Sequence, residues 1–414
     1  MIDLDIALKR MTDALAPLCM AVETIPIMDA AGRHLAADIR SKIDLPPFDK
    51  SAMDGFAILP GDHPESFGIL ETIRAGDTPS RDLAPGYCSR IMTGAPVPAG
   101  TGQVIPVECT EVAAERMRII RPTRAPNICI RGEDIRAGHV VARRGDRLDP
   151  LNLSVLISCG IETVPVVSRP RVTVFSTGDE LVSTLAEWGP GKIFDSNGPM
   201  LAELFRRHGA HVIARRHLPD DPGDTVAMLR DAMNGSDVIA FSGGVSAGDF
   251  DFIPDALTAC GLTIHFDRIR VKPGKPMTFA TGERICAFGF PGNPVSSFVM
   301  FHLFALPALQ WLQHRPVRHR MVQLPMAETW RRKKAERLEF IPVRIVPRAP
   351  GDSAHPGESA ASMAPLPYHG SAHLTAMQSD DGLAVIDAGI SSVAAGDLLP
   401  FWPVTWTAYE TAVI

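Results

Sequence analysis

The sequence RVTVFSTGDE, residues 171–180, is the first of three apolar runs that lead into polar turns. The other two are DVIAFSGG at 237–244 and RICAFGF at 284–290. Helical patterns lie between and after them, at 199–209 and in the long apolar stretch 294–312. Continuous apolar strands alternating with helices predict a parallel sheet that is covered by helices on both faces. Ligands bind such sheets at the carboxyl ends of the strands, where these turns lie.

The sequence on either side of this region predicts further domains. Residues 2–20 have apolar side chains at helical spacing, and a second helix is expected at 150–160. Between them, short strand-like runs are interrupted by Pro and Gly about every ten residues. The fold class is therefore multidomain α/β plus β. The predicted boundaries are 1–40 with 140–168 for a segmented N-terminal helical domain, 41–139 for an inserted β domain, 169–318 for the α/β domain and 319–414 for a C-terminal β domain.

Composition excludes several classes of protein. The 414 residues are 45% hydrophobic and 21% charged, which fits a globular chain. Lys and Arg number 41 against 47 Asp and Glu, so a formal charge of -6 offers no general attraction to nucleic acid or anionic membranes. The chain starts with MIDLDIALKR, which is acidic, so no secretory signal is expected. We also expect no stretch that approaches the roughly 18 apolar residues of a membrane-spanning helix. Both features predict a cytoplasmic protein. The seven scattered cysteines form no CxxC pair and are expected to be packing residues.

Polar turns after the predicted strands are the candidate sites. Residues 176–180 combine hydroxyls with carboxylates, and they are equally consistent with a capping turn. The glycine-rich segment 242–251 precedes a helical stretch, where backbone N–H groups can cradle an anion. It matches neither a dinucleotide fingerprint nor a P-loop. Within it, Asp249 and Asp251 are candidates for Mg²⁺, with solvated turn acids as an equally consistent interpretation.

Two further turns carry cations or begin a helix. The segment 271–276, VKPGKP, places Lys272 and Lys275 on a chain stiffened by prolines, which suits an oxyanion; ordinary surface lysines are the alternative. In 291–297, PGNPVSS, Pro294 fits the first turn of a helix. No HExxH or GxSxG motif occurs, so zinc hydrolysis and an α/β-hydrolase mechanism have little support.

Taken together and in order, these motifs resemble the molybdopterin molybdenumtransferase family, which includes MoeA and the gephyrin E domain. The motifs are SAMDGFA at 51–57, MTGAP at 92–96, RGEDI at 131–135, STGDEL at 176–181, SGGVSAGDFD at 242–251, VKPGKP at 271–276, PGNPVSS at 291–297, RLEF at 337–340 and GSAHL at 370–374. The resemblance implies an elongated homodimer whose subunits have a segmented helical domain, an inserted β domain, a MoaB-like α/β domain and a C-terminal β domain.

The resemblance also implies an activity. The family transfers molybdenum from molybdate to the dithiolene of adenylylated molybdopterin, with Mg²⁺ as cofactor, and releases AMP. The substrates are small molecules, and contacts with the molybdopterin adenylyltransferase and with cofactor-receiving enzymes are expected, without nucleic acid or membrane as a partner. Molybdate and phosphates are anions, so lysines and Gly-rich N–H groups can offset their charge as the phosphoanhydride breaks.

Site residues follow from the motif matches. The implied catalytic residues are Asp54 and Thr93, supplied by the partner subunit, and Glu180, Asp221 and Asp251. Asp251, with Asp249, is the candidate for metal binding, and Lys272 and Lys275 are expected to hold the oxyanion. The implied binding residues are Thr177, Gly178, Ser242, Gly243, Gly244, Ser246, Lys272, Lys275, Pro291 and Pro294, with Arg337 and Ser371 as looser candidates beside molybdate.

Two departures and two alternatives accompany this interpretation. Phe56 stands where the family usually has Tyr, so any role of that hydroxyl is absent. Asp220 and Asp221 stand where many members carry a basic residue, which weakens the assignment of Asp221. The alternative functions are a molybdopterin adenylyltransferase, which the α/β domain alone resembles, and a gephyrin-like scaffold. The sequence leaves molybdate and tungstate as alternative substrates, because the two oxyanions have nearly the same size.

Overall fold

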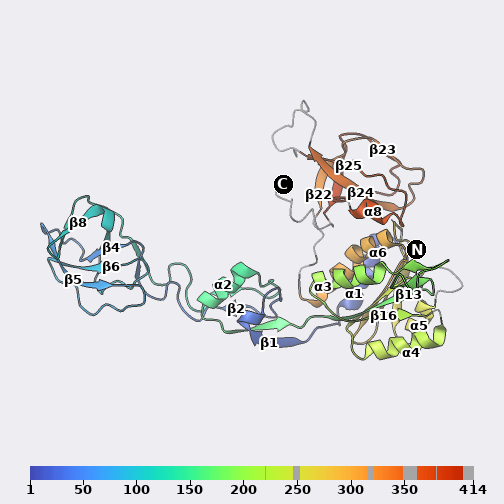
Figure 1. Ribbon diagram of the computed structural model, residues 1–414, viewed down its shortest axis with the longest axis horizontal. Helices are drawn as coiled ribbons and strands as arrows, with labels where there is room; N and C mark the ends of the chain where they lie inside the picture. The colour runs from blue at the N-terminus through green and yellow to red at the C-terminus, as the bar shows by residue number, and fades with distance from the viewer. Residues whose placement is uncertain are drawn as a thin grey trace. The chain divides into compact units, whose positions relative to one another are not determined.

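The computed structural model describes residues 1–219, 221–245, 252–315, 317, 321–347, 361–378 and 380–403. The chain forms two compact units (Figure 1). Unit 1 combines Met1–Glu23 with Val167–Ile414, and unit 2 is Thr24–Val166. Each unit has hydrophobic cores of its own, so each is described separately.

A six-stranded sheet forms the centre of unit 1. Its strand order is β16 (His211–Leu218), β13 (Arg171–Thr177), β17 (Val238–Ser242), β21 (Cys286–Phe290), β20 (Pro276–Thr281) and β18 (Thr263–Arg268). The first four strands are parallel, as the alternation of strands and helices predicts. The last two differ from that prediction: β20 is antiparallel to β21, and β18 is antiparallel to β20. These two strands follow one another with no helix to return the chain, so they pair antiparallel.

Helices cover both faces of this sheet. In β17, Val238 and Ala240 belong to one core while Ile239 and Phe241 belong to the other, because successive side chains of a strand point to opposite faces. The first core includes residues of α1 (Leu4–Leu15), α3 (Asn197–Arg207), α6 (Pro294–Met300) and α7 (Leu306–Leu312). The second includes residues of α4 (Pro222–Met233) and α5 (Ile253–Ala259).

Helix α1 packs in the α/β core, although it begins the chain. Its buried residues Ala7, Met11 and Leu15 recur every four positions and form one apolar face. The Trp311 indole donates a hydrogen bond to the Leu15 carbonyl oxygen (3.1 Å). The sequence placed this helix with a segmented N-terminal domain, whereas its apolar face is covered by the α/β domain.

The helical segment Pro294–Leu312 comprises α6, a π-helical turn at Phe301–Ala305 and α7. By length and hydropathy alone its 19 residues could cross a membrane, so the expectation that no stretch approaches that length was wrong. However, 83% of its most apolar window is buried inside the structure. The segment is therefore a core helix that packs on the sheet.

The C-terminal part of unit 1 is a β structure. Its main sheet has the order β19 (Val271–Lys272), β24 (Leu338–Pro347), β26 (Gly382–Ile386), β28 (Leu398–Trp402) and β22 (Val322–Pro325), with β25 (Ala361–Pro365) paired to β24. Smaller elements of this part are β23 (Trp330–Arg331) paired with β27 (Ser392–Val393), and α8 (Leu374–Gln378). The short pair of β14 (Leu181–Val182) with β15 (Ile193–Phe194) instead lies between β13 and α3 of the α/β domain. Strand β19 comes from the VKPGKP motif, so this motif joins the α/β domain to the C-terminal sheet.

Unit 2 has a small mixed core and a β module. The mixed core combines the short turn η1 (Ile27–Asp29) with α2 (Pro150–Ser158), β1 (Val22–Pro26) paired with β12 (Thr163–Val167), and β2 (Ile39–Arg40) paired with β11 (Val140–Ala142). The β module has the strand order β7 (Gln103–Pro106), β4 (Gly55–Ile58), β6 (Tyr87–Ile91), β5 (Phe67–Ile73), β9 (Arg116–Ile119) and β8 (Thr110–Ala113). It also contains η2 (Val107–Cys109) and the pair β3 (Lys50–Ser51) with β10 (Ile128–Cys129).

Candidate functional site

The carboxyl ends of β13, β17 and β21 meet at one edge of the α/β sheet. Thr177 at the end of β13 donates a hydrogen bond from its hydroxyl to the Ser242 carbonyl oxygen (3.1 Å). The Gly243 N–H donates to the Phe290 carbonyl oxygen of β21 (3.0 Å). Gly243 has φ +89°, and a Cβ there would lie 2.7 Å from Thr177 Oγ1, so only glycine lets the turns approach so closely. Three turns that are far apart in sequence thus form one rim.

A cavity of about 870 Å³ opens at this rim. Its lining includes the described residues that the sequence assigned to ligand binding: Thr177, Gly178, Ser242, Gly243, Gly244, Lys272, Lys275, Pro291, Pro294, Arg337 and Ser371. Glu180, predicted to be catalytic, also lines it. Ser246, Asp249 and Asp251 lie outside the described residues.

Glu180 lines the cavity from the turn after β13. A Cβ at position 178 would collide with Glu180 Oε2, so a side chain there would displace the carboxylate. Gly178 also has φ +124°, which L side chains rarely adopt. The glycine therefore makes room for the exposed acid beside the end of the strand.

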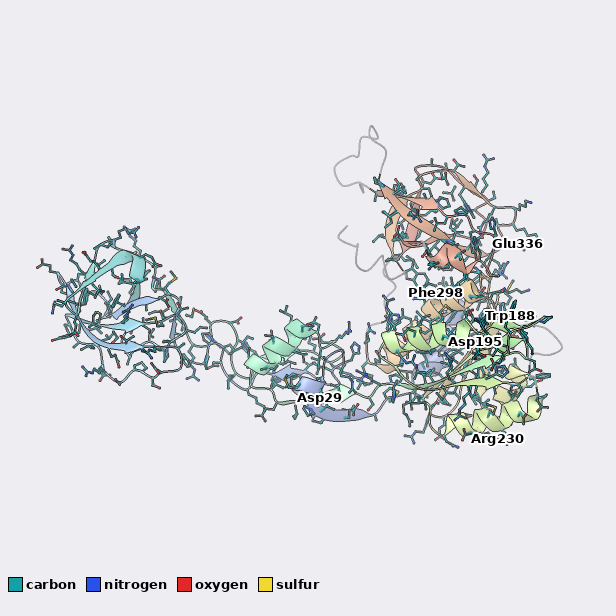
Figure 2. All side chains as sticks on the ribbon, viewed as in Figure 1. Asp29, Trp188, Asp195, Arg230, Phe298 and Glu336 are labelled. Atoms are coloured by element: carbon teal, nitrogen blue, oxygen red, sulfur yellow. The ribbon has the colours of Figure 1, made fainter. Side chains whose placement is uncertain are left out.

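Asp195 and Asn197, at the start of α3, are cavity residues that the sequence reasoning missed. Asp195 accepts hydrogen bonds from the Ser176 hydroxyl (2.7 Å) and from the Gly198 N–H (2.8 Å), which tie it to β13 and to the helix. Asn197 is only 7% exposed, and its amide donates to the Gly292 carbonyl oxygen (2.7 Å). Figure 2 labels Asp195 among the side chains of this region. The signal was an Asp-Ser-Asn run just before a helical pattern.

The C-terminal domain contributes to the same cavity through Ser371 and Arg337. The Asn293 amide donates to Ser371 Oγ (2.9 Å), and the Val295 N–H donates to the Ser371 carbonyl oxygen (3.2 Å). Arg337 donates through Nη1 to the Val271 carbonyl oxygen (3.1 Å). The two candidates from the weaker tail motifs are therefore held against the PGNP and VKPGKP segments.

The charges on the cavity wall favour an anionic ligand. Three cationic residues, Lys272, Lys275 and Arg337, face two acids, Glu180 and Asp195. Both oxygens of Asp195 already accept hydrogen bonds. Among the residues that the structure describes, no group of three or more His, Cys, Asp or Glu side chains could hold a metal ion. The three cations make the described wall suited to oxyanions and phosphates.

Asp221 lies elsewhere. It is the N-cap of α4, and its exposed carboxylate accepts a hydrogen bond from the Asp224 N–H (2.9 Å). Pro222 follows at the first position of the helix, which is where proline is preferred. Asp221 is not among the described residues that line the cavity, and capping accounts for an acid at this position.

Asp54 and Thr93 form a separate polar pair in the β module of unit 2. The N–H and the hydroxyl of Thr93 both donate to Asp54 Oδ1, each at 2.7 Å. The backbone hydrogen bond from Thr93, followed by the one from its side chain, lowers the pKa of Asp54. Both residues are exposed. Phe56, which replaces the family tyrosine, is 1% exposed and packs in the module's core, where its ring needs no polar partner.

Two family comparisons cover most of the chain. Residues 2–160 match the MoeA N-terminal region (domain I and II), and residues 173–311 match the probable molybdopterin binding domain. The second match contains β17, β21 and the carboxyl-terminal part of β13, and the ends of these strands form the cavity rim.

Similar proteins support the same family assignment. Molybdopterin molybdenumtransferase 2 of Mycobacterium tuberculosis (strain ATCC 25618 / H37Rv) is 34% identical over 401 residues, covering 92% of this chain and 95% of that protein. Molybdopterin molybdenumtransferase of Staphylococcus aureus (strain Mu50 / ATCC 700699) is 33% identical over 299 residues, covering 70% and 71%. The crystal structure of the molybdopterin biosynthesis MoeA protein from Pyrococcus horikoshii OT3 aligns with a TM-score of 0.78 at 27% identity, covering 97% and 99%. The chain therefore belongs to the molybdopterin molybdenumtransferase family, and its role is that of a transferase in molybdenum cofactor biosynthesis.

Proposed function

We propose that the protein inserts molybdenum from molybdate into adenylylated molybdopterin and releases AMP. The observation that carries this proposal is the 870 Å³ cavity, where strand-end turns of the α/β sheet and cations of two domains line one space. Both substrates are anions, and the described cations of the wall outnumber its described acids. The similarity to proteins named molybdopterin molybdenumtransferase supports molybdenum and molybdopterin as the chemistry of the substrates.

The residues of the cavity bind the anionic substrates and stabilise the leaving phosphate. Lys272, Lys275 and Arg337 bind molybdate and the phosphates by charge and hydrogen bonding. Water adds across the phosphoanhydride, so that AMP leaves with one phosphate and the pterin keeps the other. The cations stabilise the negative charge that develops on the leaving phosphate. Asp195 and Asn197 keep the ends of β13 and β21 in place around the substrate.

Mg²⁺ dependence is part of the proposal, but the described residues do not form a magnesium site by themselves. Glu180 and Asp195 are the acids of the described wall, and Asp195 is engaged in hydrogen bonds. The two acids proposed for the metal, Asp249 and Asp251, lie outside the described residues. No step of the reaction is therefore assigned to the metal. Chelation with EDTA followed by Mg²⁺ titration tests whether AMP release depends on it.

The proposal also includes a cytoplasmic homodimer in which the hydrogen-bonded pair of Asp54 and Thr93 faces the cavity of the other subunit. Its support is the family resemblance together with the exposure of both side chains, which leaves the Asp54 carboxylate accessible. Contacts with the adenylyltransferase and with cofactor-receiving enzymes belong to the same proposal. The dimer is tested by sedimentation of the full chain, and the shared site by mixing of variants.

The decisive experiment measures AMP release from adenylylated molybdopterin by the purified chain, with and without molybdate. We expect release that requires molybdate. The alternative activity, adenylylation of molybdopterin from ATP, is measured on the same preparation. Adenylylation without molybdate-dependent AMP release would replace the proposed function. The contribution of Arg337 and Ser371 to the cavity favours molybdenum insertion, because the α/β domain alone does not supply these residues.

A further inference from the structure

A second cavity, of about 840 Å³, adjoins the first in unit 1. Four residues line both cavities: Lys272, Arg337, Tyr368 and Gly370. The second cavity is otherwise lined mainly by the C-terminal domain. Lys272, to which the proposed function assigns oxyanion binding, thus lies in the wall between the two cavities.

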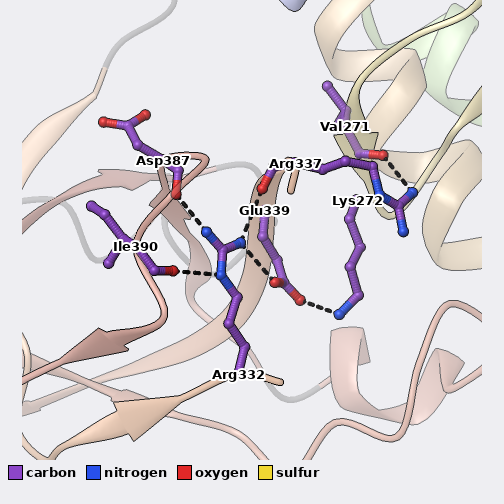
Figure 3. A network of polar contacts seen from close by, with 7 residues as sticks. All are labelled: Val271, Lys272, Arg332, Arg337, Glu339, Asp387 and Ile390. Atoms are coloured by element: carbon purple, nitrogen blue, oxygen red, sulfur yellow. Dashed lines mark hydrogen bonds and ion pairs between the residues drawn. The ribbon is translucent and has the colours of Figure 1, made fainter. Parts of the chain in front are cut away.

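Glu339 contacts the ammonium group of Lys272 (Figure 3). Its side chain is 3% exposed, and its Oε1 lies 2.6 Å from Lys272 Nζ. Its Oε2 lies 2.9 Å from Arg332 Nη1, and the Arg332 side chain is only 4% exposed. The Lys272 side chain remains 44% exposed. A buried carboxylate is therefore shared by one buried and one half-exposed cation.

Arg332 is anchored independently of this carboxylate. Its guanidinium also donates to the carbonyl oxygens of Arg337 (3.0 Å), Ile390 (2.6 Å) and Asp387. These backbone acceptors keep Arg332 in place if Glu339 loses its charge. Among the described residues, the side chain of Lys272 is held instead by its ion pair with Glu339.

The backbone aligns the same pair. Strands β19 and β24 are parallel neighbours, with Lys272 opposite Glu339 in the register. Glu339 follows Arg337 by two positions, and Arg337 lines both cavities. The C-terminal sheet thus carries both an arginine of the proposed site and the partner of its lysine.

We propose that Glu339 is a positioning residue that holds the Lys272 ammonium ready for the oxyanion. The inference rests on the proposed function and adds to it the residue that orders one of its cations. An ammonium has three N–H donors, so the pair with Glu339 leaves donors for an oxyanion. Ordering a lysine before the ligand arrives removes the entropy cost of ordering it during binding.

The charge of Glu339 alone would have the opposite effect. A carboxylate near the cavity repels an oxyanion, so its removal would tighten oxyanion binding if charge were its whole contribution. If Glu339 positions Lys272, removal of its charge weakens binding instead. The direction of the change in molybdate affinity therefore separates the two roles.

The test is Glu339→Gln in the full chain, with molybdate KM and kcat for AMP release measured beside molybdate binding by equilibrium dialysis. We expect the molybdate KM and Kd to rise about three- to tenfold, as expected for loss of one ordered side chain, while kcat at saturation stays within about twofold. A KM and Kd that fall or stay unchanged would overturn the proposal. Wild-type protein that binds molybdate but releases no AMP would refute the proposed function, whereas the dialysis comparison would still decide the role of Glu339.

A double-mutant cycle shows whether Glu339 acts through Lys272. In a Lys272→Met background, Glu339→Gln should cause no further rise in molybdate Kd, because the side chain it orders is gone. The same rise in both backgrounds would refute positioning. Glu336→Gln is the matched control, because Glu336 is an exposed acid that lines only the second cavity; its Kd should stay within about twofold of wild type.

Glu339→Asp guards against a folding defect in the Gln variant. It keeps a negative charge for the buried Arg332 but shortens the side chain by one methylene and withdraws it from Lys272. Thermal unfolding of each variant is recorded on the preparation used for dialysis. We expect Glu339→Asp to unfold near the wild-type temperature and to show the same rise in molybdate Kd. Wild-type Kd in this folded variant would contradict the proposal.

Discussion

The replacement of Gly243 by alanine tests the close approach of the three strand-end turns. The new Cβ would lie 2.7 Å from Thr177 Oγ1 and 3.2 Å from the Thr177 carbonyl oxygen, and the backbone oxygen cannot rotate away. An L-residue in the left-handed region costs about 1–2 kcal/mol. Forcing a carbon into packed space adds about 1–3 kcal/mol. We therefore expect Gly243→Ala to lower the unfolding free energy of unit 1 by about 2–5 kcal/mol.

Gly261→Ala is the matched control. Gly261 has φ +83°, close to the +89° of Gly243, but a Cβ there meets nothing within 4 Å. This variant should lower the unfolding free energy only by the backbone contribution of about 1–2 kcal/mol. The difference between the two variants measures the steric contact with Thr177.

Urea unfolding followed by tryptophan fluorescence measures the effect. All five tryptophans fall within 167–414, so their fluorescence reports on unit 1. AMP release should fall on the order of 10- to 100-fold in Gly243→Ala, since small displacements of a binding site have large kinetic effects. It should stay within about twofold of wild type in Gly261→Ala, which lies at the end of α5. Equal stability and equal turnover of the two variants would refute the predicted collision.

Three further predictions concern charge, pH and assembly. Asp54→Asn should reduce AMP release at least about tenfold, because it removes the negative charge of this residue. Thermal unfolding should stay unchanged, because the exposed amide oxygen can still accept the hydrogen bonds of Thr93. Full activity of this variant would remove Asp54 from the site. Burial lowers the pKa of His265 in the folded protein, so as pH falls the unfolded chain protonates this histidine first. The stability that neutral His265 contributes is present above about pH 6.5, and it is lost as pH falls through the lowered pKa of the folded state. Urea titrations of His265→Gln should accordingly show a weaker loss of stability between about pH 7 and 5, and an unchanged pH slope would argue against this. Asp54→Ala and Lys275→Met subunits, each nearly inactive, should recover roughly a quarter of wild-type AMP release when co-expressed, because half of randomly paired dimers carry one intact site of two; purified mixed dimers without activity would place both residues in one subunit's site.

Much of the α/β fold could be predicted from local sequence. The continuous apolar character of 172–175 and 238–241 indicated strands covered on both faces, and the two cores that share β17 confirm it. The antiparallel direction of β20 and β18 could not be predicted in this way. Strand direction depends on how the connection folds back, whereas an apolar run has the same pattern in either direction.

The candidate site was partly predictable for a related reason. Parallel strands end at the same edge of a sheet, so the turns beginning at Thr177, Ser242 and Pro291 had to meet once the sheet was recognised. Asp195 was missed because its position depends on a hydrogen bond to Ser176, 19 residues earlier in the chain. Asp221 was predicted as a site residue from its motif, but its carboxylate caps the local helix and does not line the cavity.

By itself, the sequence determined strands β13, β17 and β21 with the helices that follow them, the turns that carry polar residues, and the order of the family motifs. These properties depend on neighbouring residues and on the periods of strands and helices. Only the tertiary structure decided that Lys272 pairs with Glu339 and that α1 packs on the α/β sheet. Such contacts join residues far apart in the chain, and they are selected by burial of whole faces and by compensation of buried charge, which no local pattern encodes.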